Sequence, residues 1–174
     1  MREMIRYGLT LAIICVIAAA SLAGLNSLTR SRIFAQAQTE EELSLKQVFP
    51  EAQKFEPIKT GGETLYYKAL DKEGRFAGAV FKASAKGYSS TIEVMAGMAK
   101  EGIITAIKVI NQNETPGLGA KVAEPDFTGQ FSGKNIENLS EVSAITGATI
   151  SSEAVIDAVD KKAKEIKELI KDAR

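Results

Sequence analysis

The chemistry that this chain can support is concentrated in one hydroxyl-rich segment near its C-terminus. Residues 143–152 read SAITGATISS, and a helical pattern follows them directly. The unpaired N–H groups and the positive dipole end of a helix form a ready anion site. An ordinary helix cap needs only one of these hydroxyls. The residues alone therefore leave a phosphate site and a plain cap equally open.

A second candidate segment, residues 113–119, reads NETPGLG. Its two glycines and its proline predict a tight loop just past the end of a strand. Glycines in such a loop let backbone N–H groups approach a flat or anionic ligand, and Leu118 at the tip can cover a ring. An ordinary surface turn explains the same residues, and the segment taken alone favours the turn.

The composition excludes several kinds of site. The chain of 174 residues has no histidine, and its only cysteine, Cys15, lies in an apolar N-terminal run. Zinc sites, iron–sulfur clusters, haem with a His or Cys ligand, disulfides and His-dependent triads all need residues that are missing. The formal net charge of zero argues against a nucleic-acid partner. Redox chemistry here would therefore need an organic cofactor.

The N-terminal segment predicts a membrane anchor. Residues 7–29 carry no charge, and as a helix these 23 residues span roughly 35 Å, enough to cross a hydrocarbon core of about 30 Å. A buried core helix and a cleaved signal peptide are the alternatives. A small-x-small pattern at residues 35–37 suits cleavage, but Arg30 and Arg32 separate it from the apolar run. We expect residues 1–29 to form a cytoplasmic tip and a retained single-pass anchor in the lipid bilayer.

The rest of the chain predicts a helical connector, residues 30–50, and an extracytoplasmic domain, residues 51–174. The connector helix should end before Pro50. Alternating or apolar runs separated by short glycine turns predict four strands of an antiparallel sheet. These runs are residues 65–70, 76–81, 91–98 and 103–110.

The C-terminal part predicts a short helical piece near residues 126–131, a last strand just before Thr146, and a closing helix. Ser151 or Ser152 can cap that helix. Its apolar stripe consists of Val155, Val159, Ala163, Ile166 and Ile170. Helices before and after a run of strands indicate an α+β domain, here attached to the N-terminal transmembrane helix.

Three segments carry a resemblance to a known family. Thr146-Gly147-Ala148-Thr149 resembles the covalent-FMN attachment motif Asp-x-x-[Ser/Thr]-Gly-Ala-[Thr/Ser] of the FMN-binding domain, and residues 114–119 resemble that domain's second signature. Residues 87–94 resemble its strand entry. The domain occurs in the G subunit of Rnf complexes and in the C subunit of the sodium-pumping NADH:quinone reductase, and the short chain suits the former.

The resemblance implies that FMN is bonded through its phosphate to the hydroxyl of Thr149, by a flavin transferase that uses FAD. It also implies a set of neighbours. Thr146, Gly147, Ala148, Ser151 and Ser152 would surround the phosphate, while Tyr88, Glu114, Thr115, Gly117, Leu118 and Gly119 would line the rest of the cofactor. The chain departs from the family at Ser143, where Asp is usual, and at Gln112 and Asn113, where His and Lys are frequent.

The implied function is that of an electron relay without catalytic residues of its own. Rnf complexes move electrons between ferredoxin and NAD and couple this flow to Na⁺ or H⁺ transport, so the expected partners are the other membrane and redox subunits. Two other functions stay open. One is a free-standing, anchored, extracytoplasmic flavin reductase, and the other is a binding module without cofactor in which the Thr149 segment is only a helix cap.

Overall fold

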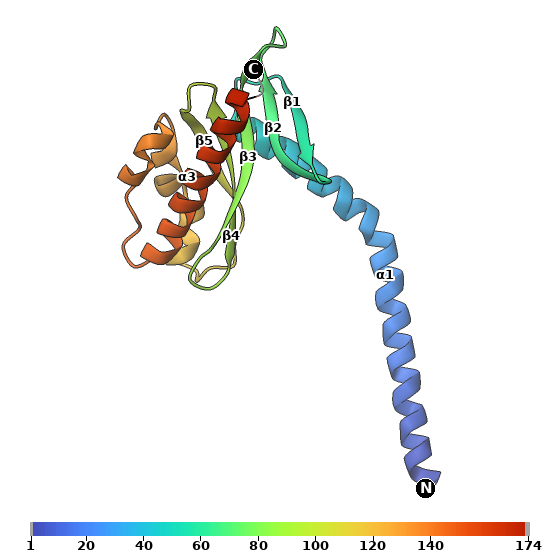
Figure 1. The fold of residues 1–174 in the computed structure, drawn as a ribbon. Helices are drawn as coiled ribbons and strands as arrows, with labels where there is room; N and C mark the ends of the chain where they lie inside the picture. The colour runs from blue at the N-terminus through green and yellow to red at the C-terminus, as the bar shows by residue number, and fades with distance from the viewer. Residues whose placement is uncertain (1, 173–174) are drawn as a thin grey trace. The chain divides into compact units, whose positions relative to one another are not determined.

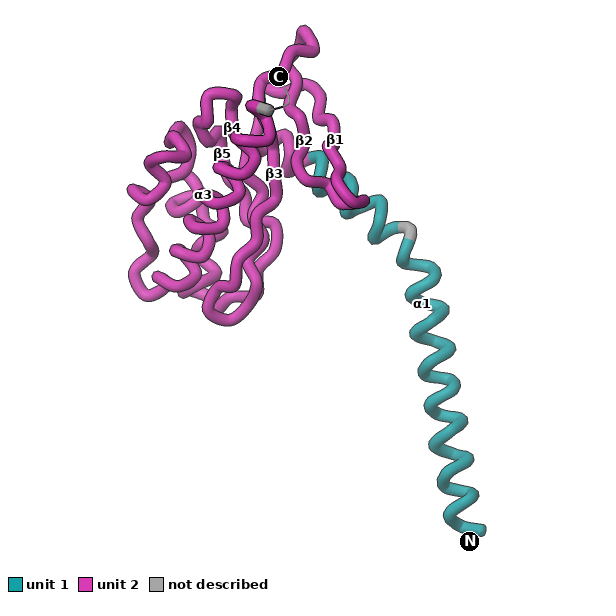
Figure 2. Tube along the Cα trace, in the orientation of Figure 1, with its two compact units in different colours: residues 1–42 teal, residues 43–174 magenta. Residues whose placement is uncertain are grey.

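A computed structural model describes residues 2–172 of the chain, without the side chains of Ser31 and Asp172. Its contacts divide the chain into two compact units, residues 1–42 and 43–174, which Figure 2 colours separately. Helix α1 (Arg2–Val48) makes up the first unit as far as Glu42, and its last residues, from Leu43 on, belong to the second unit. Among the described residues, α1 is the one helix long and apolar enough to cross a membrane. It ends before Pro50, as the sequence predicts.

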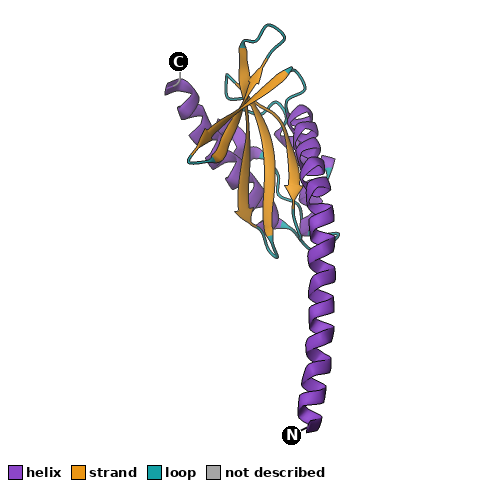
Figure 3. Ribbon diagram, turned by 90° about the vertical axis from the view of Figure 1, so that its right-hand side faces the viewer, coloured by secondary structure: helices purple, strands orange, loops and turns teal. Residues whose placement is uncertain are grey.

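The second unit contains an antiparallel sheet in which each strand pairs with the next along the chain (Figures 1 and 3). The four expected strands and their antiparallel pairing are confirmed, and the sheet has a fifth strand, β1, that the sequence pattern did not predict. The strands are β1 (Lys54–Thr60), β2 (Glu63–Leu70), β3 (Phe76–Lys86), β4 (Thr91–Ala99) and β5 (Ile104–Asn111).

Short helical turns and one long helix follow the sheet. The turns are η1 (Gly119–Ala123), α2 (Pro125–Thr128), η2 (Gly129–Phe131) and η3 (Ile136–Glu141), and the helix is α3 (Thr149–Asp172). The predicted piece near residues 126–131 is confirmed. The strand expected before Thr146 is wrong, because residues 142–148 contain no strand. The capping prediction is also wrong, since α3 begins at Thr149 and both serines lie inside its first turn.

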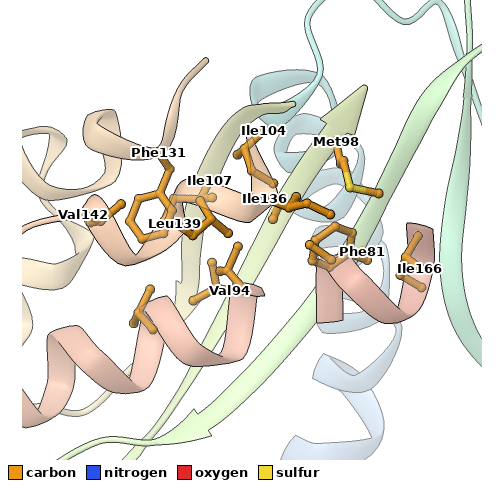
Figure 4. Packing of buried hydrophobic residues seen from close by; sticks show 14 of the residues in the cluster. Phe81, Val94, Met98, Ile104, Ile107, Phe131, Ile136, Leu139, Val142 and Ile166 are labelled. Carbon is orange, nitrogen blue, oxygen red and sulfur yellow. The ribbon is translucent and has the colours of Figure 1, made fainter. Parts of the chain in front are cut away.

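The main core lies between one face of the sheet and α3 with the short helical turns (Figure 4). Four members of the predicted α3 stripe, Val155, Val159, Ala163 and Ile166, are fully buried, and Ile170 packs against the same core. Phe127 and Phe131 meet edge to face, with ring centroids 5.5 Å apart. Helices and an antiparallel sheet therefore share one core, and the α+β prediction is confirmed.

A smaller core covers the opposite face of the sheet. It contains the end of α1 and the residues that follow it, packed on β2, β3 and β4. Its buried members are Leu45, Val48, Phe49, Ala52, Ala69, Val80 and Met95. Gly97 in β4 leaves room for the carbonyl of Val48, which also accepts a hydrogen bond from Thr105 Oγ1. Both faces of the sheet are thus covered, and the loops at one end of its strands remain free to form a site.

Candidate functional site

Three loops far apart in the sequence meet around one pocket of about 460 Å³, within the range of small-molecule sites. The turn between β3 and β4 contributes Tyr88, the loop after β5 contributes residues 114–119 in part, and the start of α3 contributes residues 147–151. The lining residues are Tyr88, Glu114, Thr115, Leu118, Gly119, Gly147, Ala148, Thr149, Ile150 and Ser151.

Thr149 stands at the N-terminal end of the 24-residue helix α3, and its side chain is exposed. The first N–H groups of a helix have no partner inside the helix, so they favour an anion at this end. Gly147 precedes the helix with φ of +81°, a conformation that glycine adopts easily and other residues rarely do. The chain therefore turns sharply just before it presents the hydroxyl of Thr149 at the pocket.

Side chains hold the backbone before α3 in place. The Ile145 N–H donates to Ser152 Oγ at 3.0 Å, and that hydroxyl donates to the carbonyl of Ala148 at 2.9 Å. Upstream, the Ser143 N–H donates to Gln130 Oε1 at 2.9 Å, and Gln130 Nε2 donates back to the Ser143 carbonyl at 3.4 Å. Backbone groups that a strand would have paired are bonded to side chains, which explains why no strand forms here.

Glu114 is almost fully buried, with 6% of its surface exposed. Its Oε1 accepts the N–H of Ser89 at 3.0 Å and both the N–H and the hydroxyl of Ser90, at 2.8 and 3.1 Å. Its Oε2 accepts the hydroxyl of Ser151 at 2.7 Å. Burial raises the pKa of the Glu114 carboxyl, but these four hydrogen bonds outweigh it and hold that pKa below its ordinary value.

The rim of the pocket is apolar and exposed. Tyr88 is 71% exposed, Ile150 is 56% exposed and Leu118 is 49% exposed, and all three line the pocket. Large apolar side chains gathered around a concave site are typical of ligand pockets. A flat apolar ring system carrying an anionic tail fits this arrangement, since the tail can lie at the start of α3 and the ring against the rim.

The structure brings together most of the residues that the sequence singled out. Nine of them line the pocket, namely Tyr88, Glu114, Thr115, Leu118, Gly119, Gly147, Ala148, Thr149 and Ser151. Thr146, Gly117 and Ser152 are not among the lining residues, and Ser152 is buried beneath the loop. Ile150 lines the pocket and was missed. The sequence feature that could have predicted it is an apolar side chain on the first turn of α3, outside the buried stripe of that helix.

Two family profiles match the chain. The FMN-binding domain matches residues 87–164, which include all three loops of the pocket. The RnfG N-terminal region matches residues 1–48, which include the whole of α1. The two matches therefore correspond to the two ends of the architecture, the long N-terminal helix and the domain that contains the pocket.

Curated relatives match along nearly their full length. The chain is 36% identical to the G subunit of an ion-translocating oxidoreductase complex of Methanosarcina acetivorans, over 91% of this chain and 92% of the relative. It is 31% identical to the G subunit of the Na⁺-translocating ferredoxin:NAD⁺ oxidoreductase complex of Acetobacterium woodii, over 91% and 89% of the two chains. The G subunit of the proton-translocating complex of Clostridium ljungdahlii is 30% identical, over 90% and 88%.

Among solved structures, the chain is similar to NqrC of Shewanella oneidensis, with a TM-score of 0.49 and 18% identity over 70% of this chain and 74% of that one. The assignment does not depend on this similarity. It depends on the curated relatives, which are G subunits, and on the two matching profiles. The RnfG N-terminal region precedes the FMN-binding domain along the sequence. The chain therefore belongs to the family of G subunits of Rnf-type ion-translocating oxidoreductase complexes.

Proposed function

We propose that this chain is the electron-relay subunit of a membrane ion-translocating ferredoxin:NAD oxidoreductase complex, and that it carries FMN covalently bonded to Thr149. The observation that carries the proposal is the place of the Thr149 hydroxyl, exposed at the start of α3 and on the wall of an apolar-rimmed pocket. The relatives of Acetobacterium woodii and Clostridium ljungdahlii, both named as subunits of ferredoxin:NAD⁺ oxidoreductase complexes, support the setting.

The attachment step uses one atom of this chain as nucleophile. The Oγ1 of Thr149 forms a bond to the phosphorus of the FMN half of FAD, and the diphosphate bond on the other side of that phosphorus breaks. AMP leaves, and the hydroxyl proton passes to the flavin transferase that catalyses the exchange. The N–H groups of the first turn of α3 would hold the attached phosphate and stabilise its charge.

Once FMN is bound, it supplies the ability to accept and release electrons. The chain's own residues hold the cofactor and limit its contact with water. Leu118 and Ile150 offer apolar surface to the ring system, and Tyr88 offers an aromatic face at the rim. This arrangement requires no proton donor or acceptor among the side chains, which suits a relay that binds neither ferredoxin nor NAD itself.

The proposal also places the chain in its membrane setting. Helix α1 lies in the lipid bilayer with the N-terminus in the cytoplasm, and the domain lies outside the cytoplasm among the other membrane and redox subunits of the complex. The length and the composition of α1 support the span. A covalent bond suits a cofactor outside the cytoplasm, because a dissociated flavin would be lost there.

The test is intact-mass analysis of the full chain, produced together with its flavin transferase. The unaltered chain should gain the mass of one FMN ester and keep its yellow colour after denaturation. The variant Thr149→Ala should gain no such mass, whereas Thr149→Ser should keep part of the loading because it retains a hydroxyl. Thr64→Ala is the matched control, since Thr64 is an exposed threonine in β2 that lies outside the pocket and outside the attachment motif. Loading of Thr149→Ala to the level of the unaltered chain contradicts the proposal.

A further inference from the structure

The sequence assigned Glu114 and Ser151 to the cofactor, but the structure bonds these two side chains to each other. Ser151 Oγ donates to Glu114 Oε2 at 2.7 Å, and both residues are almost fully buried. The other carboxylate oxygen accepts three hydrogen bonds from Ser89 and Ser90 in the β3–β4 turn. One carboxylate thus connects all three loops that form the pocket.

The four donors to Glu114 are uncharged groups, and a buried carboxylate that has neutral donors is costly to place. Hydrogen bonds from several donors compensate this cost only while all of the donors stay aligned. The carboxylate therefore tolerates little movement of the β3–β4 turn or of the first turn of α3. A residue that needed only to fill space here could have been apolar.

Two glycines leave space beside this carboxylate. A Cβ atom on Gly87 would lie 2.7 Å from Glu114 Oε1, and one on Gly119 would lie 2.6 Å from Oε2 and 2.8 Å from Ser151 Oγ. Neither glycine has the positive φ that would by itself favour glycine. Gly119 therefore leaves space for the Glu114 carboxylate and the Ser151 hydroxyl, and Gly87 leaves space for the same carboxylate and for the Ile92 side chain.

We infer that Glu114 is a positioning residue, whose bond to Ser151 sets where the hydroxyl of Thr149 stands relative to the pocket. Ser151 lies two residues after Thr149 in the same first helical turn, so a shift of its hydroxyl moves the backbone that bears Thr149. The inference rests on the proposed function, because it concerns the reactivity of the Thr149 hydroxyl toward FAD. Glu114 acts through Ser151 and does not itself take part in the bond that forms.

The experiment measures the initial rate of flavin attachment to the purified full chain in detergent, with purified transferase and FAD, by intact mass. Ser151→Ala and Glu114→Gln should each slow attachment by roughly ten- to a hundredfold, as expected when a reacting group is misplaced by about an ångström. The double variant should be no slower than the slower single variant, since both remove the same connection.

Two controls separate positioning from stability and from charge. Ile166→Ala empties a buried position in the second half of α3, so it should lower the melting temperature without slowing attachment to the folded chain. Glu124→Gln removes an exposed negative charge outside the pocket and should leave the rate within about twofold of the unaltered chain. Hydrogen exchange adds a readout without flavin, because the Ser89 and Ser90 amides should lose protection in a Glu114→Ala variant.

The outcomes are distinguishable. If the unaltered chain loads normally and attachment is not slowed in Ser151→Ala and Glu114→Gln, the positioning role of Glu114 is overturned and the proposed function is not. A loss of rate that follows the melting temperature, with Ile166→Ala slowed to the same extent, also overturns it. An unaltered chain that takes up no flavin overturns the proposed function and this inference together.

Discussion

Neighbouring hydroxyls in the segment before and within the first turn of α3 have different surroundings in the folded chain. Thr149 presents its hydroxyl at an open pocket, whereas Ser151 donates to Glu114 and Ser152 is bonded to the backbone of Ile145 and Ala148. A serine with two hydrogen bonds and no exposed surface is a poor nucleophile for an external substrate. Among the hydroxyls of this turn, burial and bonding therefore favour Thr149 as the proposed acceptor.

The lowered pKa of Glu114 gives the domain a definite dependence on pH. Its folded pKa lies below the ordinary value of 4.5, so the ionised carboxylate stabilises the fold above that value. The contribution is lost as the pH falls through the folded pKa, because the protonated carboxyl cannot accept the same hydrogen bonds. We expect the free energy of unfolding of the unaltered chain to decrease on acidification in this range.

Glu114→Gln tests this dependence. At neutral pH we expect the variant to lose about 1–3 kcal/mol, because hydrogen bonds to a charged acceptor are replaced by weaker ones. Below pH 4.5 the difference between the two chains should shrink. Glu56, Asp71 and Glu168 also have pKa values lowered by their partners, and they are unchanged in both chains, so they cancel in the comparison. Denaturant unfolding in detergent at a series of pH values measures the free energy of unfolding of both chains. If the difference between the two chains stayed the same at every pH, the predicted role of the Glu114 carboxylate would be contradicted.

At the scale of elements, the sequence predicts structure well where local pattern and long-range packing agree. Every second residue of β4, from Ile92 to Met98, and the stripe of α3 face one core, so their periodicity alone is sufficient to predict these two elements. Strand β1 was missed because Lys54, Pro57 and Lys59 interrupt any apolar pattern in it. A proline is tolerated there because β1 is at the edge of the sheet.

Two wrong predictions have one physical reason, which is hydrogen bonding between side chains and backbone groups that the local sequence pattern does not reveal. The pattern predicts a strand just before Thr146, but Gln130 and Ser152 bond to the backbone groups of Ser143 and Ile145 there. The serine expected to cap α3 instead lies within its first turn and bonds backward to Ala148. The pairing of Glu114 with Ser151 spans 37 positions of sequence and has no local signature at all.

The contact between β4 and the end of α1 gives a prediction for one glycine. A Cβ at Gly97 would collide with the carbonyl of Val48 and with Thr105 Oγ1, which are bonded to each other. We expect Gly97→Ala to destabilise the domain by about 1–3 kcal/mol, since a rigid backbone group must move. Gly129→Ala is the control, because nothing lies within 4 Å of the added atom and Gly129 has an ordinary helical φ of −64°. Denaturant midpoints measure both, and equal shifts would contradict the assigned contact.

Across the whole molecule, a change in side-chain exposure marks the point at which α1 becomes part of the compact domain. Residues 2–30 of α1 expose their side chains along the helix, whereas Leu45, Val48 and Phe49 are buried in the smaller core of the domain. The sequence places the start of the domain at residue 51, and that assignment remains a prediction. The compact unit of the structure begins at Leu43, so the last turn of α1 contributes to the stability of the domain that carries the pocket.

Two shortened chains test this contribution. A chain of residues 43–174 keeps both cores, whereas one of residues 51–174 lacks Leu45, Val48 and Phe49 and exposes Val80 and Met95.

Burial of each missing side chain is worth about 1.5–3 kcal/mol, and the three together approach the total stability of about 5–15 kcal/mol that is typical of a domain. We expect the longer chain to unfold cooperatively in denaturant and the shorter one to unfold at a much lower concentration or to be unfolded throughout. Within the longer chain, Val48→Ala should cost about 1–3 kcal/mol, and Leu43→Ala should cost little because Leu43 is exposed. Equal stability of the two shortened chains would show that the end of α1 is dispensable, and the domain would then depend on the larger core alone.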